Sequence, residues 1–328
     1  MATLTVGVGK EFSTIKAAVA ASHNGDVVQV QAGTYKNDFA TISTSITLQA
    51  VGGRVNMVAT IPPPNLKGML TIGTTGSAPD VSITGFSFSG VHIKAGAGGN
   101  GAGIRYQSGN LTLSQDWFHG NQDGLLATPF VTDTGSITID HSEFGFNGSG
   151  TGQTHNLYVG MIGSLSITNS YFHDAKVGHE IKSRAEVNTI ENNRIFANNG
   201  TDSYSIDLPN GGRDIVSGNV IEKGLHSENN KMIAFLEAPG SGDPHVGSDQ
   251  GHWGASSLMI SGNTFVNDKA SPNTIGLWNA NTMPLMPTVA DNSFWNISPA
   301  SAISGPASMS GTNWLTSRPI LSTAHPWS

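Results

Sequence analysis

The chain has 328 residues with 41 glycines and no cysteine; only 12% of its residues are charged, and its formal net charge is −7. The lack of cysteine excludes a disulfide framework and thiol chemistry, and the negative charge argues against nucleic acid as a partner. No apolar run approaches the roughly 20 residues that a membrane-spanning helix needs, so we expect no membrane partner either. The many glycines and neutral polar residues are typical of turn-rich β structure.

The first element along the chain is a predicted helix over residues 13–22, with Ser13 as its N-cap and Asn24-Gly25 as its stop. Residues 1–24 would then cover one end of the structure that follows. Residues 1–4 do not begin a signal peptide, so export would require a leader that has been removed, or another route.

A strand pattern recurs after this helix, in which alternating apolar residues are followed by a small polar residue. The copies are spaced by roughly 23 to 30 residues, with one longer gap, and no single copy can bury a core of its own. The pattern predicts an all-β, single-domain parallel β-helix (a β-solenoid) over residues 25–298, followed by an irregular C-terminal cap over residues 299–328. The aligned inward positions are Ile83, Leu113, Ile139, Ile167, Ile190, Val216, Ile260 and Val289.

Asparagine occupies one position three residues after this aliphatic column. Asn193, Asn219, Asn263 and Asn292 fall there, and serine stands at the same place in two earlier copies. Such a column is what an internal asparagine ladder in the turns of a parallel β-helix requires, because each amide can bond to the next. We therefore interpret these asparagines as structural.

A second strand lies between the copies of the first, with a second column of inward aliphatic residues. Residues on either side of this column would point outward and stack coil over coil at about 4.7–4.9 Å. The predicted outward rows are Asn156, Glu180, Ser205 and Tyr158, Lys182, Asp207. The inward column is Leu125, Leu157, Ile181, Ile206, Ile233 and Ile275.

Residues 178–184 carry the densest group of charges on this second strand. Glu180, Lys182 and Arg184 occupy alternate positions, and alternate side chains of a strand share one face. On a solvent-facing strand, two cations and a carboxylate could hold an acidic sugar, although an ordinary solvated face would show the same pattern. Residues 237–253 form a long gap in the repeat and are a candidate wall or lid over this surface.

The start of the repeat resembles that of pectin-lyase-like right-handed parallel β-helix proteins in residues 12–15, 25–30 and 32–35. More narrowly, residues 180–183 with Asn188 and Asn192-Asn193 are similar to the lysine-serine strand of the alginate lyase and chondroitinase B family. The resemblance implies that Lys182 is the base that removes the C5 proton of a uronic acid. An arginine assists on the next coil in that family, but Asp207 stands there in this chain. Calcium is a possible cofactor by the same resemblance, although residues 174–178 do not show the family's acidic ligands.

Elimination at a uronate requires a base, a proton donor for the leaving oxygen and groups that neutralise the carboxylate. Lys182 lies beside Arg184, Tyr158 would lie one coil earlier, and His155 and His179 stand at strand entrances, where either can act as acid or base. These five residues are the candidate catalytic group. The candidate substrate-binding residues are Asn156, Glu180, Asp207, Asn210 and Arg213.

Polysaccharide lyase is the favoured function, with an acidic polysaccharide as the partner, an extracellular or cell-surface location and a monomeric state. A uronate C5-epimerase would use the same base. A glycoside hydrolase would need a carboxylate pair, which could come from Asp123, Glu180 and Asp207. A non-catalytic carbohydrate-binding or surface module is the alternative of another class.

Overall fold

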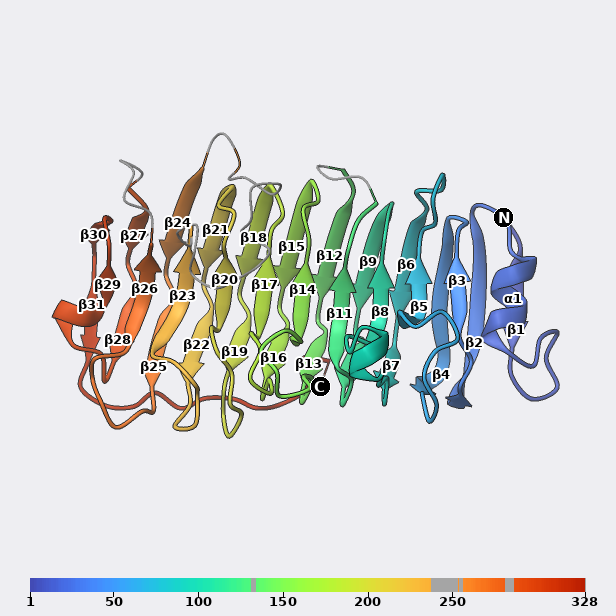
Figure 1. Cartoon of the computed structure of the whole chain (residues 1–328), viewed down its shortest axis with the longest axis horizontal. Helices are drawn as coiled ribbons and strands as arrows, with labels where there is room; N and C mark the ends of the chain where they lie inside the picture. Colours follow the sequence, from blue (N-terminus) through green and yellow to red (C-terminus); the bar gives the residue numbers. More distant parts are fainter. Residues whose placement is uncertain (131–133, 237–252, 254–255, 281–285, 328) are drawn as a thin grey trace.

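The computed structural model describes residues 1–130, 134–236, 253, 256–280 and 286–327. Figure 1 shows a long stack of coils, in which each short strand pairs in parallel with the corresponding strand of the neighbouring coil. Each full coil contributes three strands, so the stack has three faces. This arrangement confirms the predicted parallel β-helix, and crossovers between parallel strands are right-handed with few exceptions.

The first and second faces join in one sheet, because β2 and β4 run across both. The strands of the first face are β1 (Thr3–Val6), β2 (Asp26–Lys36), β4 (Ile46–Val58), β6 (Asp80–Thr84), β9 (Asn110–Ser114), β12 (Ser136–Asp140), β15 (Ser164–Thr168), β18 (Val187–Glu191), β21 (Arg213–Ser217), β24 (Ser257–Ser261), β27 (Thr288–Ala290) and β30 (Ser308–Ser310). Those that belong to the second face alone are β7 (Phe86–Ser89), β10 (Trp117–His119), β13 (Glu143–Gly145), β16 (Tyr171–His173), β19 (Arg194–Phe196), β22 (Val220–Lys223), β25 (Thr264–Asn267), β28 (Ser293–Trp295) and β31 (Asn313–Leu315).

The third face is a separate sheet. Its strands are β3 (Ala40–Ile42), β5 (Gly68–Ile72), β8 (Ala102–Tyr106), β11 (Asp123–Ala127), β14 (Leu157–Val159), β17 (Ile181–Ser183), β20 (Ile206–Leu208), β23 (Lys231–Phe235), β26 (Ile275–Asn279) and β29 (Ile303–Ser304). The helical segments are α1 (Ile15–Ala21) and the 3₁₀ turns η1 (Ala95–Ala97) and η2 (Pro299–Ser301). In the part of the chain that the structure describes, no helix is long and apolar enough to cross a membrane.

The core lies inside the stack and is built from columns of inward side chains that occupy the same position in successive coils. The predicted column from Ile83 to Val289 is confirmed, since each of its members pairs with the next. The second column is right up to Ile233 and wrong at Ile275. Ile233 pairs with Leu277, and Ile275 pairs with Lys231 instead. The coil between them is longer than its neighbours, so spacing alone could not locate the inward residue.

The turn from the first face to the second explains the recurrent small polar residue. One residue in each of these turns adopts a left-handed conformation, among them His141, Asn169, Asn192 and Gly218. The next side chain then points into the corner, where the change of direction would leave a buried backbone N–H without a partner.

The predicted asparagine ladder fills this corner and is confirmed. Asn193, Asn219 and Asn263 each donate a side-chain N–H to the next amide oxygen at 3.0 Å. Asn219 also accepts the backbone N–H of Asn193 at 2.8 Å and donates to the carbonyl of Ile190 at 2.8 Å. The ladder therefore pairs backbone groups that the strands cannot reach.

The N-terminal helix is shorter than predicted. It spans Ile15–Ala21, and its N-cap is Thr14 rather than Ser13, because the Thr14 hydroxyl accepts the N–H of Ala17 at 3.2 Å. The segment before it is not only a cap, since β1 pairs in parallel with β2 and starts the first face. A strand had not been expected there because it precedes the first recognisable copy of the repeat.

The C-terminal segment also departs from the predicted irregular cap. Strands β29, β30 and β31 continue the three faces as far as Leu315. Residues 316–327, here called the C-terminal strap, then run back along the stack to the level of β13 (Figure 1). Arg318 pairs with Asp268, and His325 Nδ1 lies 2.6 Å from a carboxylate oxygen of Glu143. The strap thus connects the last coils to the middle of the second face.

We expect Asn219→Ala to lower the free energy of unfolding by about 1–3 kcal/mol, because it leaves buried groups of the ladder unpaired. Thermal or denaturant unfolding checks this, with the exposed Asn199→Ala as control. Equal stability of Asn219→Ala and the wild type would contradict the ladder.

His173 generates a prediction for the pH dependence of stability. Burial alone would lower the pKa of His173, but hydrogen bonds from its ring to Asp174 and Glu143 raise the pKa to about 9. The folded state therefore holds a proton that the unfolded state releases near pH 6.5. The stability contributed by this site should be complete below pH 6.5 and should be lost as the pH rises through about 9.

The measurement compares the melting temperatures of the wild type and His173→Gln across this range, with His92→Gln, at an exposed histidine, as control. The difference between wild type and His173→Gln should shrink with increasing pH. A difference that stays constant from pH 6.5 to above 9 would show that His173 is not charged in the folded protein.

Candidate functional site

The outward side chains of the third face form a continuous row along the stack. Strand pairing places Tyr158 beside Lys182 and Lys182 beside Asp207, as predicted. The same row continues to Ala234 on β23 and to Trp278 on β26. The row therefore runs along the long axis of the stack, from β14 to β26.

Lys182 and Asp207 form the central ion pair of the row. The Lys182 Nζ lies 3.1 Å from Asp207 Oδ2, and His179 Nε2 lies 3.4 Å from the same oxygen. The row was predicted to face solvent, but Lys182 exposes only 6% of its surface and Asp207 none. Burial makes the charged pair much more sensitive to the loss of one partner than an exposed pair would be.

Arg184 connects the start of the row to the following coil. Its Nε donates to the Tyr158 hydroxyl at 3.0 Å, and its Nη1 donates to the Asn210 side-chain oxygen at 2.6 Å. The Arg184 side chain is fully buried, and the Trp253 indole donates to its backbone carbonyl at 3.2 Å. Arg184 is therefore placed to hold the phenol of Tyr158 in one orientation.

Each of the two candidate histidines accepts a hydrogen bond from a backbone N–H at its ring nitrogen Nδ1. His155 Nδ1 accepts the backbone N–H of His179 at 2.9 Å, and His179 Nδ1 accepts that of Tyr204 at 3.0 Å. A ring nitrogen that accepts a hydrogen bond carries no proton, so a neutral ring bears its proton on Nε2. In His179 this places an N–H toward Asp207. The rings also stack, with centroids 4.8 Å apart.

Burial holds the pKa of His179 well below its usual value, and the nearby His155 and Lys182 lower it further. His179 is therefore neutral in the folded protein at neutral pH. It can donate a hydrogen bond from Nε2 to Asp207 but does not contribute a positive charge to the site.

Asn156 and Glu180 were predicted to face outward, and that prediction is wrong. Both are fully buried and point into the corner between the second and third faces. The Asn156 amide donates to one oxygen of the Glu180 carboxylate. The other oxygen of this carboxylate accepts the N–H of Ala175 at 2.9 Å. Strands β14 and β17 begin one residue later, at Leu157 and Ile181, so the alternation of faces does not extend back to these positions.

Glu180 continues a second internal ladder. The Asn121 amide donates to Asn147 at 3.2 Å, and the Asn147 amide donates to Asn156 at 2.8 Å. Burial raises the pKa of Glu180 well above its usual value, and the negative charge of Asp202 raises it further. Glu180 therefore supports the corner behind the row and does not reach the outer surface. Ser205, predicted in the same outward row, is also buried.

Arg213 lies apart from the group that surrounds Lys182. It begins β21 on the first face, is largely exposed, and pairs with Glu186 at 3.1 Å. Only two residues separate it from Asn210, but the chain turns a corner of the coil between them. The structure therefore brings together Tyr158, Lys182, Arg184, Asp207, Asn210 and the two histidines.

The residues near Lys182 do not fit a calcium site. Calcium requires six to eight oxygen ligands, whereas this group offers the carboxylate of Asp207, paired with a lysine, and an amide oxygen of Asn210 that accepts from Arg184. Across the described residues, no group of three or more histidine or acidic side chains is arranged to hold a metal ion.

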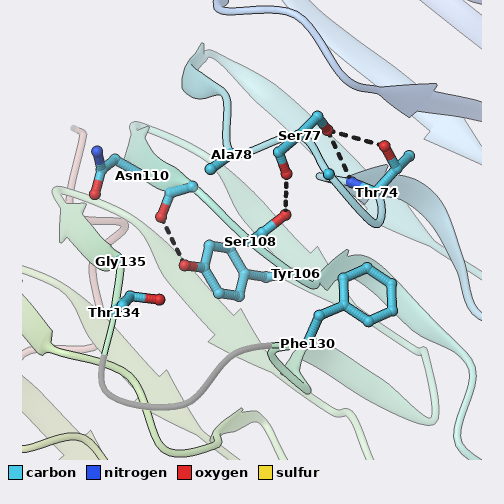
Figure 2. A pocket seen from close by; sticks show the side chains of 11 residues that line it. Thr74, Ser77, Ala78, Tyr106, Ser108, Asn110, Phe130, Thr134 and Gly135 are labelled. Carbon is cyan, nitrogen blue, oxygen red and sulfur yellow. Dashed lines mark hydrogen bonds between the residues drawn. The ribbon is translucent and has the colours of Figure 1, made fainter.

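A separate pocket lies near β8 and β9 and shares no residue with the Lys182 group. Figure 2 shows the Tyr106 hydroxyl bonded to the Gly109 carbonyl, at 2.6 Å, and the Ser108 hydroxyl bonded to the Ser77 carbonyl, also at 2.6 Å. Burial raises the pKa of Tyr106 to about 12. Among the described residues, the lining offers hydroxyls and one exposed aromatic ring, Phe130, but no group suited to proton transfer at neutral pH.

The sequence interpretation missed Tyr204, Lys231 and Trp278, which extend the same surface. Tyr204 and Lys231 stand two residues before the inward Ile206 and Ile233, the offset that was noticed only for His155 and His179. Applying that offset to every copy would have found both. Residues 237–252 of the predicted wall or lid lie outside the described residues.

We expect His179 to stay neutral, with its proton on Nε2, as the pH is lowered through 6.5, the ordinary histidine value. Nitrogen chemical shifts of labelled histidine check this, with His179→Gln to assign the signal. His173 provides an internal contrast, since it should be charged at neutral pH. An imidazolium signal for His179 above pH 6.5 would contradict the assigned tautomer.

Comparison with solved structures shows that the fold is shared with polysaccharide lyases. The pectate lyase Pel9A is 14% identical, with 95% of this chain and 78% of that chain covered and a TM-score of 0.57. An alginate lyase from Paenibacillus sp. strain FPU-7 is 15% identical, with 95% and 99% covered and a TM-score of 0.58.

A third similar structure is ORF18 of Geobacillus virus E2, at 14% identity and a TM-score of 0.60, where 92% of this chain covers 58% of that chain. No family model matches the chain, and no curated protein matches it. At these identities the likeness concerns the fold: the chain has the parallel β-helix that the pectate and alginate lyases share.

Proposed function

We propose that the protein is a polysaccharide lyase that cleaves a uronic-acid-containing polymer by β-elimination. The observation that carries this proposal is the adjacency of Lys182 and Tyr158 on paired strands, with the Arg184 guanidinium on the phenol oxygen. These residues supply a nitrogen base and a hydroxyl donor on one outward row.

In the proposed reaction, the neutral amine of Lys182 takes the C5 proton of the uronate. The electron pair left at C5 forms the double bond between C4 and C5, and the bond from C4 to the leaving oxygen breaks. The Tyr158 hydroxyl gives its proton to that oxygen. General acid and base groups of this kind typically contribute about 10²–10⁴-fold each to the rate.

Asp207 prepares Lys182 for this role. A lysine paired with a carboxylate is normally an ammonium, which cannot accept a proton. Asp207 Oδ2 lies 3.1 Å from the Lys182 Nζ, however, and can accept one proton from it. Transfer of one proton from Lys182 to Asp207 produces the free amine, and the N–H of His179 stays directed at the same carboxyl oxygen.

The hydrolase alternative loses most of its support. It required a pair among Asp123, Glu180 and Asp207, but the carboxylates of Asp123 and Glu180 accept backbone N–H groups inside the corner and do not belong to the outward row. Asp123 accepts the backbone N–H of His155 at 2.8 Å, and burial raises its pKa to about 7. Only Asp207 belongs to the outward row, so a pair on both sides of a glycosidic bond is lacking among these three.

The fold adds support for the substrate class. Pectate and alginate are both polymers of uronic acids, and the lyases named for them share this architecture with the chain at TM-scores of 0.57 and 0.58. Polysaccharide processing is therefore the general activity that we propose, and elimination at a uronate is its specific form.

The test uses Lys182→Arg on polygalacturonate and alginate, with ultraviolet absorbance to detect the unsaturated product. Arginine can keep the ion pair with Asp207 but stays protonated, so it cannot act as the base. We expect turnover to fall by about 100-fold or more while the melting temperature stays close to that of the wild type. Lys182→Ala is less suitable because it removes the cation that pairs with the buried Asp207 carboxylate.

Lys176→Arg, at an exposed lysine, is the matched control and should keep full activity. Near-normal turnover by Lys182→Arg would eliminate the lysine base. In the wild type, new reducing ends without absorbance would indicate a hydrolase, altered sugar composition without cleavage an epimerase, and an unchanged polymer a binding module. Assays with added calcium and with a chelator test metal dependence.

A further inference from the structure

We infer that Lys231 and Trp278 form a distal subsite that binds a second uronate unit of the same polymer. The inference rests on the proposed function, because it assumes that the reacting unit lies at Lys182. It extends the site along the stack toward the C-terminal coils.

Two parallel rows of side chains lead from the reacting group to this subsite. The first is the row from Tyr158 and Lys182 through Asp207 and Ala234 to Trp278. The second consists of side chains that stand two residues before the inward residue of each strand. In it the His179 ring stacks on the Tyr204 ring, with centroids 4.8 Å apart and planes at 7°. Lys231 is the next member of this second row, since it stands two residues before Ile233 as Tyr204 does before Ile206.

The two rows converge at Lys231 and Trp278. The Lys231 Nζ lies 2.9 Å from the centroid of the Trp278 ring, and the Tyr204 ring lies 6.1 Å from the same indole. A cation on an indole face is held by the negative potential of the ring, so the ammonium has a defined position on the surface. Lys231, Tyr204 and Trp278 all remain partly exposed, whereas Lys182 and Asp207 are buried.

Trp278 has this position because of its place in the strand. Alternate residues of β26 face opposite sides, and Leu277, which is 2% exposed, is the one that enters the core. Trp278 therefore points outward beside Ala234, whose methyl group is the smallest side chain in the row from Tyr158 to Trp278.

The distance between the two sites determines what kind of ligand can use both. Three strand spacings separate Lys182 from Trp278, which corresponds to about 14 Å. One sugar ring is shorter than that, so a single uronate cannot contact both groups. A polymer that follows the stack can place one carboxylate near Lys182 and another near Lys231.

The combination of groups identifies the ligand class. An ammonium can pair with a uronate carboxylate, and aromatic side chains beside it can pack on the apolar face of a sugar ring. A neutral polymer would lose the first of these contacts and keep the second. We therefore assign the subsite to an anionic sugar unit.

The experiment measures kcat and KM of Lys231→Met and Trp278→Ala on polygalacturonate and alginate and on the shortest oligosaccharide of the same polymer that the wild type cleaves. We expect KM for the polymer to rise by about tenfold, the equivalent of about 1.4 kcal/mol of lost contact. The kinetic constants for the short substrate, which cannot span both sites, should not change.

Trp327→Ala is the matched control, since it removes a similar cation–π contact outside the proposed subsite. There the guanidinium carbon of Arg54 lies 4.0 Å from the centroid of the Trp327 ring. It should leave both substrates unaffected. Methyl-esterified pectin provides a second control, because Lys231→Met should bind it as well as the wild type does. Unchanged KM on the polymer, or equal losses on polymer and short substrate, would overturn the subsite.

A binding measurement separates this inference from the proposed reaction. Affinity for polygalacturonate and alginate is measured without turnover in the Lys182→Arg background, and also in the wild type if the wild type proves inactive. Weaker binding by Lys231→Met in either background would support the subsite even if no unsaturated product forms. Equal binding by Lys231→Met and its parent would reject it, whatever the outcome of the lyase assay.

Discussion

The structure depends on one interaction at the corners of the coil. Where the chain changes direction between two faces, a buried backbone N–H loses its strand partner, and a side chain from the next coil accepts it. Asn219 does this for Asn193, and Asn263 does it for Asn219. An unpaired buried N–H would cost about 1–3 kcal/mol at each coil, so these side chains keep successive coils in register. The outward rows of the third face are therefore aligned in the same register.

The same task is performed by ionisable side chains next to the candidate site. Asp123, His155 and His179 each accept the backbone N–H of the following coil at the entrance to the third face. Just behind them, the amide ladder ends in Glu180, close to the fully buried pair of Lys223 and Asp202, whose charged atoms are 2.7 Å apart. Groups that build the corner thus also determine the electrostatic surroundings of Lys182, and the neutral state of His179 is one result.

Much of the fold could be predicted because the physical pattern repeats. Strand alternation has a period of two, and each coil adds another copy, so the column from Ile83 to Val289 and the asparagine ladder were both correct. The candidate site was predicted less well, since it lies where the regular pattern ends. Glu180 and Asn156 precede their strands by one residue and turn into the corner, and Ile275 follows a coil of unusual length. In neither case does the alternation rule apply.

The sequence by itself determined the parallel β-helix, its inward columns as far as Ile233 and Val289, and the stacking of Tyr158, Lys182 and Asp207, because these follow from local alternation and a fixed repeat. Only the tertiary structure decided which polar residues face outward, that Lys182 and Asp207 are buried together, and that Arg184 bonds to both Tyr158 and Asn210. Direction and burial at a corner depend on how neighbouring coils pack. That packing joins residues more than 20 positions apart, and no local pattern encodes it.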